Sequence, residues 1–535
     1  MGEINKIVIV GGGSAGWMTA ATLIKAFPDK DIFVIESKDV PTVGVGESTI
    51  GGIRNWTRFI GLEEKDFFLA TDASLKLSIK FTDFYRKDGG AFHYPFGQAM
   101  AEPNSNPFFY WHLKKFLYPE TPTEDFVQCL FPAAALFENN KFSLNNDGAF
   151  DIFNAGNDVA YHFDATKFGV WLREFICKPN GVTHLVSTVT SVITNDSGVE
   201  KLILETGEEV YADLFVDCTG FKSLLLGDAL QEPFRSLSNL LPNNRAWATR
   251  LAYEDKEKEL EGFTNCTAIE NGWCWNIPLW SRLGTGYVYS DKFVDPETAK
   301  EEFKQYLMSD KMIVPRTREQ VDALEFKDVK MRVGLHERTF VKNVVAIGLS
   351  AGFIEPLESN GLFSVHEFLF KLVDILQRGR ISQFDRDMYN VNVRTLFDNF
   401  SKFVTLHYAL SHRDDTPYWE DIQNKSFTAW DNDPYTPHLG KSDAFNNIIW
   451  RYMDEWGHPY GMQGITYVAT GLQLFMINEA RFMNLSYRLN RDLVEEARTQ
   501  DAVWNARKEK WKRAADNSPT LKQFLEENFY GKKDS

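Results

Sequence analysis

Three glycines near the N-terminus have the spacing that binds the pyrophosphate of a dinucleotide. Gly11, Gly13 and Gly16 form G-x-G-x-x-G directly after an apolar run at residues 7–10. The first glycine permits a tight turn, the second lets the pyrophosphate approach the backbone, and the third lets helix and strand pack closely. Glu36 ends the next apolar run, where a carboxylate can accept hydrogen bonds from a ribose. This order predicts a βαβ cradle for an adenine dinucleotide rather than a plain glycine-rich turn.

The residues around this motif extend the predicted cradle. Ser14 and Ala15 begin the helix, whose unpaired N–H groups would face an anion. A glycine-punctuated segment containing Val45, Gly46 and Glu47 follows the second strand. Loops of this composition are common. Its closeness to the cradle nevertheless favours a strap that covers the cofactor.

A second strand-to-helix turn predicts another anion site. A buried strand leads through Gly348 into a polar turn, and an apolar helix follows at residues 362–378. The backbone N–H groups of Asn360 and Gly361 could hold a halide or the edge of a reduced flavin.

Lys76 and Glu358 are candidate catalytic side chains, and the sequence pattern supports Glu358 more strongly than Lys76. Glu358 is next to the predicted anion site, which suggests a proton acceptor or a hydrogen-bond anchor. The alternative is that Glu358 and Ser359 merely cap the helix. Lys76 shares one face of an alternating run at residues 73–81 with a second lysine. By pattern alone, such a lysine is expected to face solvent.

Two aromatic segments could enclose a flat ligand. Trp273, Trp275 and Ile277 alternate, so they share one strand face, and Pro278 ends the ladder. These rings could form a rigid, dry wall, although core packing is the more frequent use of such residues. The segment at residues 91–97 could line a substrate pocket or anchor a loop, through His93, Tyr94, Pro95 and Phe96. Ser359 is a further candidate residue of that pocket.

Composition limits the possible partners and location. The net charge of −16 over 535 residues argues against nucleic acid or an anionic membrane as the main partner. The five cysteines have no C-x-x-C or metal spacing, which is typical of reduced thiols and predicts no metal site. With neither a signal peptide nor a membrane span in the pattern, we expect a cytoplasmic protein.

Five motifs in the right order make the chain resemble the flavin-dependent halogenases of the tryptophan-halogenase type. The most specific is GWCWNIP at residues 272–278. The others are GGGSAG (11–16), GVGEST (44–49), SLKLSIKF (74–81) and EPLESNG (355–361). The similarity also includes HFDA (162–165), LFVDCTGF (214–221) and DDTPYW (414–419).

The resemblance implies a fold and a cofactor. It implies an α/β protein with a glutathione-reductase-like FAD/NAD(P)-binding domain, a mixed β substrate region and a largely helical C-terminal region. We expect a catalytic domain at residues 1–378 and a mostly helical region at 379–535 that completes the substrate pocket. FAD would be reduced by a separate flavin reductase, and a homodimer is compatible with the resemblance.

The resemblance also implies the chemistry. Reduced FAD, O2 and a halide (chloride, bromide or iodide) would form hypohalous acid behind the tryptophan wall. Lys76 would then hold or carry the electrophilic halogen, as an ammonium or as a haloamine, and Glu358 would orient it or take the ring proton. This reverses the solvent-facing interpretation of Lys76.

Departures from the family pattern bear on the substrate. Tyr94 stands where tryptophan halogenases carry a histidine, and Asn360 replaces the halide-turn threonine. The C-terminal tyrosine and tryptophan cluster that clamps free tryptophan in those enzymes is not recognisable between Asp433 and Gln473. We therefore expect another small aromatic substrate of the indole, phenol or pyrrole class. The alternatives are a flavin-dependent aromatic monooxygenase of the same fold and a non-catalytic flavoprotein.

Overall fold

The computed structural model describes residues 4–38, 47–101, 107–431, 462–475, 477–488 and 490–531. Its dinucleotide-binding part is built on a six-stranded sheet in the order β20-β21-β12-β1-β2-β8. The strands pair in parallel except for the edge strand β20. They are β1 (Lys6–Val10), β2 (Asp31–Glu36), β8 (Thr183–Val186), β12 (Leu214–Asp217), β20 (Phe340–Val341) and β21 (Val344–Ala346).

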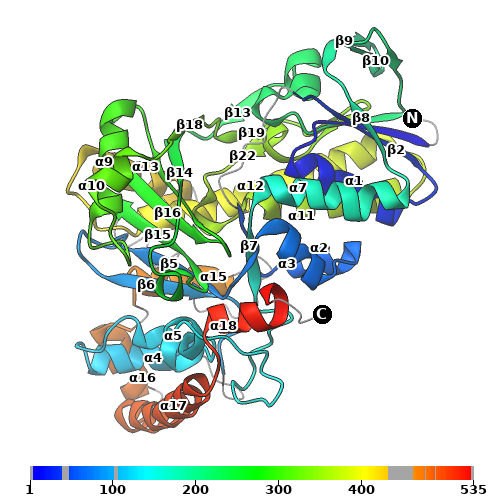
Figure 1. The fold of residues 1–535 in the computed structure, drawn as a ribbon. Helices are drawn as coiled ribbons and strands as arrows, with labels where there is room; N and C mark the ends of the chain where they lie inside the picture. The colour runs from blue at the N-terminus through cyan, green and yellow to red at the C-terminus, as the bar shows by residue number, and fades with distance from the viewer. Residues whose placement is uncertain are drawn as a thin grey trace.

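Three helices pack together beside β1 and β2, as Figure 1 shows: α1 (Ser14–Ala26), α7 (Ala165–Trp171) and α11 (Gly361–Leu376). Asp164 caps α7 by accepting hydrogen bonds from the backbone N–H groups of Thr166 and Lys167. By contrast, α11 has Asn360 at its N-cap and no side-chain capping bond. The alternative in which Glu358 and Ser359 cap this helix is therefore wrong.

A seven-stranded sheet forms the second large layer, in the order β18-β14-β17-β16-β15-β5-β6. Neighbouring strands are antiparallel except for β15 and β5. The strands are β5 (Ser78–Thr82), β6 (Ala91–Pro95), β14 (Arg245–Leu251), β15 (Phe263–Ile269), β16 (Gly272–Pro278), β17 (Leu283–Tyr289) and β18 (Lys327–Lys330).

The run at residues 73–81 forms two strands rather than one. β4 (Ser74–Lys76) ends before Leu77, whose N–H bonds to the carbonyl of Gly262, and β5 then joins the large sheet. Lys76 has no exposed surface. The solvent-facing interpretation of Lys76 from its strand pattern is wrong because both faces of this segment are covered.

A small three-stranded sheet, β3-β7-β4, joins the two layers. It comprises β3 (Glu47–Ser48), the central β7 (Ala160–Phe163) and β4. In this sheet His162 lies opposite Ser48 on one side and opposite Ser74 on the other. The register thus places three polar side chains in one row on one face.

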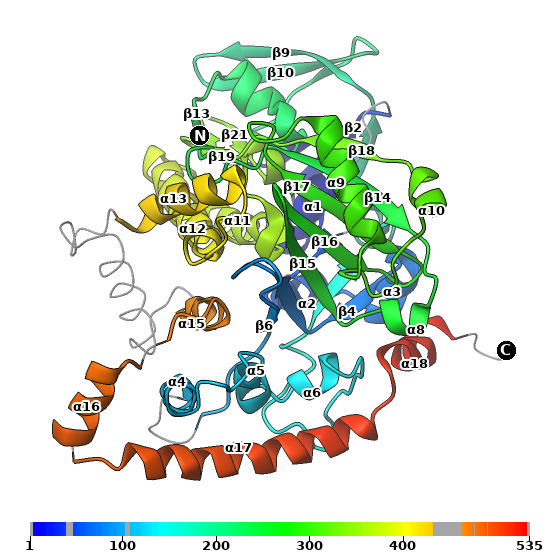
Figure 2. The same cartoon turned by 90° about the vertical axis from the view of Figure 1, so that its left-hand side faces the viewer.

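Long helices form most of the C-terminal part. Figure 2 shows α17 (Leu493–Asp516) running beneath α4 (Pro107–Leu117), α5 (Asp125–Leu130) and α6 (Ala134–Phe137). The others are α12 (Gln383–Ala409), α13 (Pro417–Asp431), α15 (Met462–Gly471), α16 (Glu479–Arg488) and α18 (Leu521–Leu525). The predicted division at residue 378 falls between α11 and α12, which pack against each other. One hydrophobic core contains residues from both sides of it.

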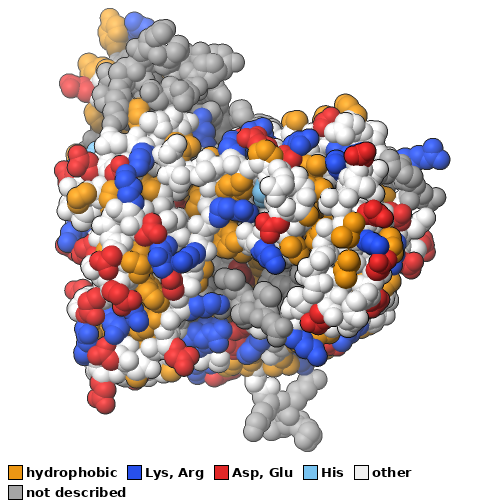
Figure 3. Space-filling model, turned by 90° about the horizontal axis from the view of Figure 1, so that it is seen from above, with side chains coloured by type: hydrophobic (Ala, Val, Ile, Leu, Met, Phe, Trp, Pro, Cys, Tyr) orange, Lys and Arg blue, Asp and Glu red, His pale blue; other side chains and the backbone are white. Residues whose placement is uncertain are grey.

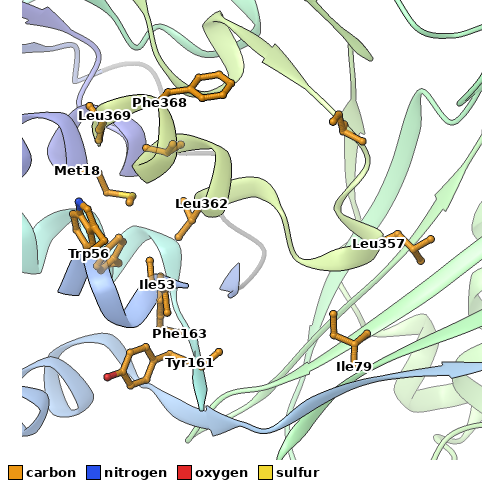
Figure 4. Close-up of a cluster of buried hydrophobic side chains, with 14 of the residues drawn as sticks. Met18, Ile53, Trp56, Ile79, Tyr161, Phe163, Leu357, Leu362, Phe368 and Leu369 are labelled. Carbon is orange, nitrogen blue, oxygen red and sulfur yellow. The ribbon is translucent and has the colours of Figure 1, made fainter. Parts of the chain in front are cut away.

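This core extends from the cradle to the start of α11. Figure 4 shows Met18 of α1, Trp56 of α2 (Ile53–Ile60) and Leu362 of α11 gathered in it, with Leu357 and Ile79 farther along. The start of α11 is therefore fixed on both sides by buried side chains.

The surface is mixed in charge on the face seen in Figure 3, where acidic and basic side chains alternate around small hydrophobic groups. All five cysteines are buried free thiols. Within the described ranges, no helix is both long and apolar enough to cross a membrane.

Candidate active site

A cavity of about 610 Å3 lies beside the cradle and is lined by residues from both large sheets and from α11. Most of the predicted cofactor residues line it: Gly11, Gly13, Ser14, Ala15, Glu36, Glu47 and Gly348. Gly16 lies one turn into α1, and Val45 and Gly46 lie outside the described residues.

The glycines of the cradle differ in what a side chain would meet. A Cβ on Gly11, at φ +115°, would lie 2.2 Å from the carbonyl oxygen of Cys218, and one on Gly16 would lie 1.8 Å from that of Gly11. A Cβ on Gly13 would have no atom within 4 Å. Gly11 and Gly16 thus permit close backbone packing, whereas Gly13 leaves room for a ligand at the start of α1. The cavity and the cradle therefore fit a bound dinucleotide.

The two acidic residues that line the cavity have different surroundings. The Oε2 atom of Glu36 lies 2.9 Å from Nε2 of His184 and 3.5 Å from the guanidinium of Arg173. Burial, together with the charge of Asp164, raises the pKa of Glu47 to about 7. Glu36 is thus paired with basic side chains, and Glu47 is close to half protonated near neutral pH.

Trp273, Trp275 and Ile277 face the cavity, as their alternation predicted, and Pro278 ends β16. The indole N–H of Trp273 donates to Oε2 of Glu355 at 2.9 Å. The same oxygen accepts hydrogen bonds from Asn243 and Tyr408. Burial raises the pKa of Glu355. A buried polar network therefore holds one face of the tryptophan wall.

Lys76 is surrounded by acceptors on three sides. Its Nζ donates to Oγ of Ser48 at 2.8 Å, to the carbonyl oxygen of Thr49 at 2.9 Å and to Oγ of Ser359 at 2.8 Å. Burial lowers the pKa of Lys76 to about 7, against the opposing charge of Glu358. The side chain can therefore change protonation state close to neutral pH.

Glu358 is buried in the turn before α11 and lies beside a histidine that the sequence did not point to. Nε2 of His407, on α12, is 2.6 Å from Oε1 of Glu358. The other ring nitrogen, Nδ1, lies 3.3 Å from the carbonyl oxygen of Phe403. Because a carbonyl oxygen can only accept, Nδ1 carries a hydrogen in this contact, and Nε2 faces the carboxylate of Glu358.

Asn360 and Gly361 line the cavity at the start of α11. The backbone N–H groups of this first turn have no intrahelical acceptor. Asn360 is 4% exposed, and its Oδ1 atom has no hydrogen-bond partner among the described residues. The anion site that the sequence predicted at the start of α11 stays a prediction.

Tyr94 and Phe96 lie near Lys76 and Glu358. The Lys76 ammonium is 5.2 Å from the ring centroid of Phe96. Burial and the charge of Glu358 raise the pKa of Tyr94, whose ring meets Phe403 and Tyr467 edge-on. The C-terminal helices therefore cover this end of the site.

His93 turns to the opposite face of β6. Its Nδ1 lies 2.9 Å from Oγ of Ser78, and its ring stacks on Phe137 at 4.5 Å. Pro95 is buried on the same face as His93, by the alternation of the strand. The structure thus brings Tyr94 and Phe96 to the site and leaves His93 and Pro95 behind β6.

The fold and the site together define a dinucleotide-binding cavity lined in part by Trp273 and Trp275, with a buried polar centre at Lys76 whose partners Ser48 and Ser359 line the same cavity. Residues 6–430 match the tryptophan halogenase family. The chain is 34% identical over 440 residues to 7-chloro-L-tryptophan 6-halogenase KtzR of Kutzneria sp. (strain 744), covering 78% of this chain and 82% of KtzR. It is 31% identical over 548 residues to tryptophan 7-halogenase RebH of Lentzea aerocolonigenes, covering 98% of each.

Solved structures agree with this assignment. The apo structure of VirX1 is 35% identical, with a TM-score of 0.89 over 99% of this chain and 100% of that one. Tryptophan 6-halogenase SttH of Streptomyces toxytricini superposes with a TM-score of 0.81 at 30% identity, over 97% and 99% of the two chains. The chain therefore belongs to the tryptophan halogenase family and is a flavin-dependent halogenase that uses FAD and a halide.

Proposed function

We propose that this enzyme halogenates an electron-rich aromatic ring with hypohalous acid held by Lys76, and that Glu358 receives the ring proton. The observation that carries the proposal is the position of these two buried side chains. Lys76 donates to Ser359, which directly follows Glu358 and lines the same cavity as Trp273 and Trp275.

The cradle residues would hold the cofactor. Gly11, Gly13, Ser14, Ala15 and Gly16 would receive the pyrophosphate, and Glu36 the ribose, with Glu47 and Gly348 along the remaining cavity. Bound and reduced, FAD would supply the oxidising chemistry by which O2 and a halide give hypohalous acid. Asn360 and Gly361 would hold the halide on the backbone N–H groups of α11.

Lys76 would hold the small oxidant by exchanging one hydrogen bond. Its three N–H groups are already accepted, so the ammonium can bind hypohalous acid only if one acceptor gives way. Ser359 is the best candidate because its backbone is in the left-handed region, at φ +55°, in a short turn. The amine form, which a pKa of about 7 makes available, would instead form a haloamine.

Glu358 would accept the proton from the cationic intermediate that forms when the ring is halogenated. A negative carboxylate also stabilises this cation by charge. His407 lies 2.6 Å away and can share the proton that arrives at Glu358. This proton must leave the pair before the next turnover.

We propose a small substrate of the indole, phenol or pyrrole class rather than free tryptophan. Tyr94 and Phe96 would face it from β6, and the region at residues 379–535 would complete its pocket. The contacts of Tyr94 with Phe403 and Tyr467 support a pocket formed jointly by β6 and the region at residues 379–535. A separate reductase would supply reduced FAD, and the five buried thiols favour a cytoplasmic location.

The experiment supplies reduced FAD, O2 and each of chloride, bromide and iodide to the enzyme with a panel of electron-rich arenes. Mass spectrometry should show halogenated products whose formation requires the halide. Hydroxylated products that form without halide would establish the monooxygenase alternative instead. Flavin binding with no product from any arene would favour the non-catalytic flavoprotein.

A further inference from the structure

A continuous row of hydrogen bonds leads away from Lys76 into the small sheet. Oγ of Ser48, which accepts from Lys76, lies 2.6 Å from Oγ1 of Thr264. The same Oγ1 lies 2.9 Å from Nε2 of His162. Each of these side chains is at least nine-tenths buried. The row therefore connects Lys76 to His162 through two largely buried hydroxyl groups, those of Ser48 and Thr264, which also line the cavity.

The far end of the row fixes the tautomer of His162. Nδ1 of His162 lies 3.4 Å from Oγ of Ser74, and the hydroxyl of Ser74 donates to the carbonyl oxygen of Pro278. Because the single hydrogen of Ser74 is already used, its oxygen can only accept from Nδ1–H. Burial and the charge of Lys76 lower the pKa of His162 well below its usual value, which keeps the ring neutral. Its Nε2 must then be an acceptor.

This acceptor sets the direction of every hydrogen in the row. Thr264 donates to Nε2 of His162, so Ser48 must donate to Thr264, and the oxygen of Ser48 is left to accept. It accepts from Lys76, and from Ser359 at 3.0 Å. If Nε2 could not accept, the hydroxyl of Ser48 would be free to turn around and donate to a neutral Lys76.

We propose that His162 is a positioning residue that orients the Lys76 ammonium through Thr264 and Ser48. This role rests on the proposed function of Lys76 as the group that holds hypohalous acid. It also explains why the small sheet keeps Ser48, His162 and Ser74 in one row.

The remaining titratable groups around Lys76 are few in the part of the chain that is described. Glu358 approaches from the turn before α11, and the thiol of Cys266 approaches from β15. Burial raises the pKa of Cys266, so this thiol carries no charge near neutral pH. Glu358 and the hydroxyl row are thus the groups that decide where the hydrogens of Lys76 point.

The variant Thr264→Val breaks the row while keeping the shape of the side chain. We expect about a 10- to 100-fold loss of halogenated product per reduced FAD consumed, because a displaced Lys76 would hold the oxidant poorly. Thr264→Ser restores the hydroxyl and should restore the yield. Thr267→Val is the matched control, since Thr267 is buried on the same strand with its side chain on the opposite face.

A second measurement requires no cofactor. With 15N-labelled histidine, the imidazole shifts of His162 should report the Nδ1–H tautomer, and His162→Asn identifies the signal. Thr264→Val should lower the population of the Nδ1–H tautomer of His162, and Thr267→Val should leave this population unchanged. An Nε2–H tautomer in the wild-type protein, or equal yields from Thr264→Val and wild type, would overturn the proposal. A wild-type enzyme that halogenates nothing would instead overturn the proposed function.

Discussion

The cofactor cradle and the Lys76 centre are built in opposite ways. The cradle comes largely from one contiguous segment, in which Gly16 packs on the carbonyl of Gly11, although Gly11 itself packs against the carbonyl of Cys218 from another part of the chain. The Lys76 centre is assembled from separate elements, and Ser48 and Ser359, which bond to the same ammonium, are 311 positions apart. Binding is thus encoded locally, whereas the chemistry depends on the packing of the whole fold.

This difference explains how much the sequence could predict. The βαβ cradle follows from glycine spacing and apolar runs because both act over short distances. The ends of β16 and its tryptophan face were also predictable, since the alternation of a strand is local. The position of Lys76 could not be predicted from its own strand pattern, which indicated a side chain facing solvent. Only the resemblance to the family motifs pointed to a role in the site.

Other parts of the site needed the three-dimensional register. His162 belongs to the HFDA motif, but its partners are fixed by the pairing of β3, β7 and β4. No sequence feature pointed to His407, which reaches Glu358 because α12 packs across the core. His93 was expected beside Tyr94, yet strand alternation sends the two side chains to opposite faces.

The largest expected effect comes from the chemical centre. Glu358→Gln keeps the size of the side chain but cannot accept the ring proton or balance the cationic intermediate. We expect halogenated product to fall by about 10²- to 10⁴-fold while oxidation of reduced FAD continues. Product quantified by mass spectrometry against FAD consumption tests this, and an unchanged ratio would remove Glu358 from proton transfer.

A smaller effect is expected on the free energy of unfolding, through the lowered pKa of Lys76. The folded protein holds Lys76 with a pKa of about 7, below the value near 10.4 expected in the unfolded chain. Between these values the unfolded state binds more protons, so this lysine destabilises the fold at neutral pH and the penalty shrinks as pH rises.

We therefore expect Lys76→Met to raise the free energy of unfolding by about 2 kcal/mol at pH 7. The gain should disappear toward pH 10.5. Chemical denaturation at both pH values measures it, and a variant that is less stable than wild type at pH 7 would show that the three hydrogen bonds outweigh the cost of the buried charge.

The smallest effect is expected at the cradle. Gly13 has φ −78° and ψ −174°, which any residue can adopt, and its side-chain direction is open. Gly13→Val should change stability by less than about 0.5 kcal/mol and weaken FAD binding about tenfold. Gly16→Ala offers the contrast, because its Cβ would collide with the backbone of Gly11 and lower stability. Flavin fluorescence measures FAD binding and thermal unfolding measures stability, so the two methods together distinguish the effects of Gly13→Val and Gly16→Ala. Undiminished FAD binding by Gly13→Val would place the pyrophosphate elsewhere.

The separation of binding from chemistry is tested most directly by the amount of halogenated product formed per reduced FAD consumed in Lys76→Met. We expect FAD consumption at the wild-type rate with no halogenated arene, and a normal ratio in the control Lys80→Met, which alters a half-buried lysine on the neighbouring strand. Halogenated product from Lys76→Met at the wild-type ratio would contradict the account.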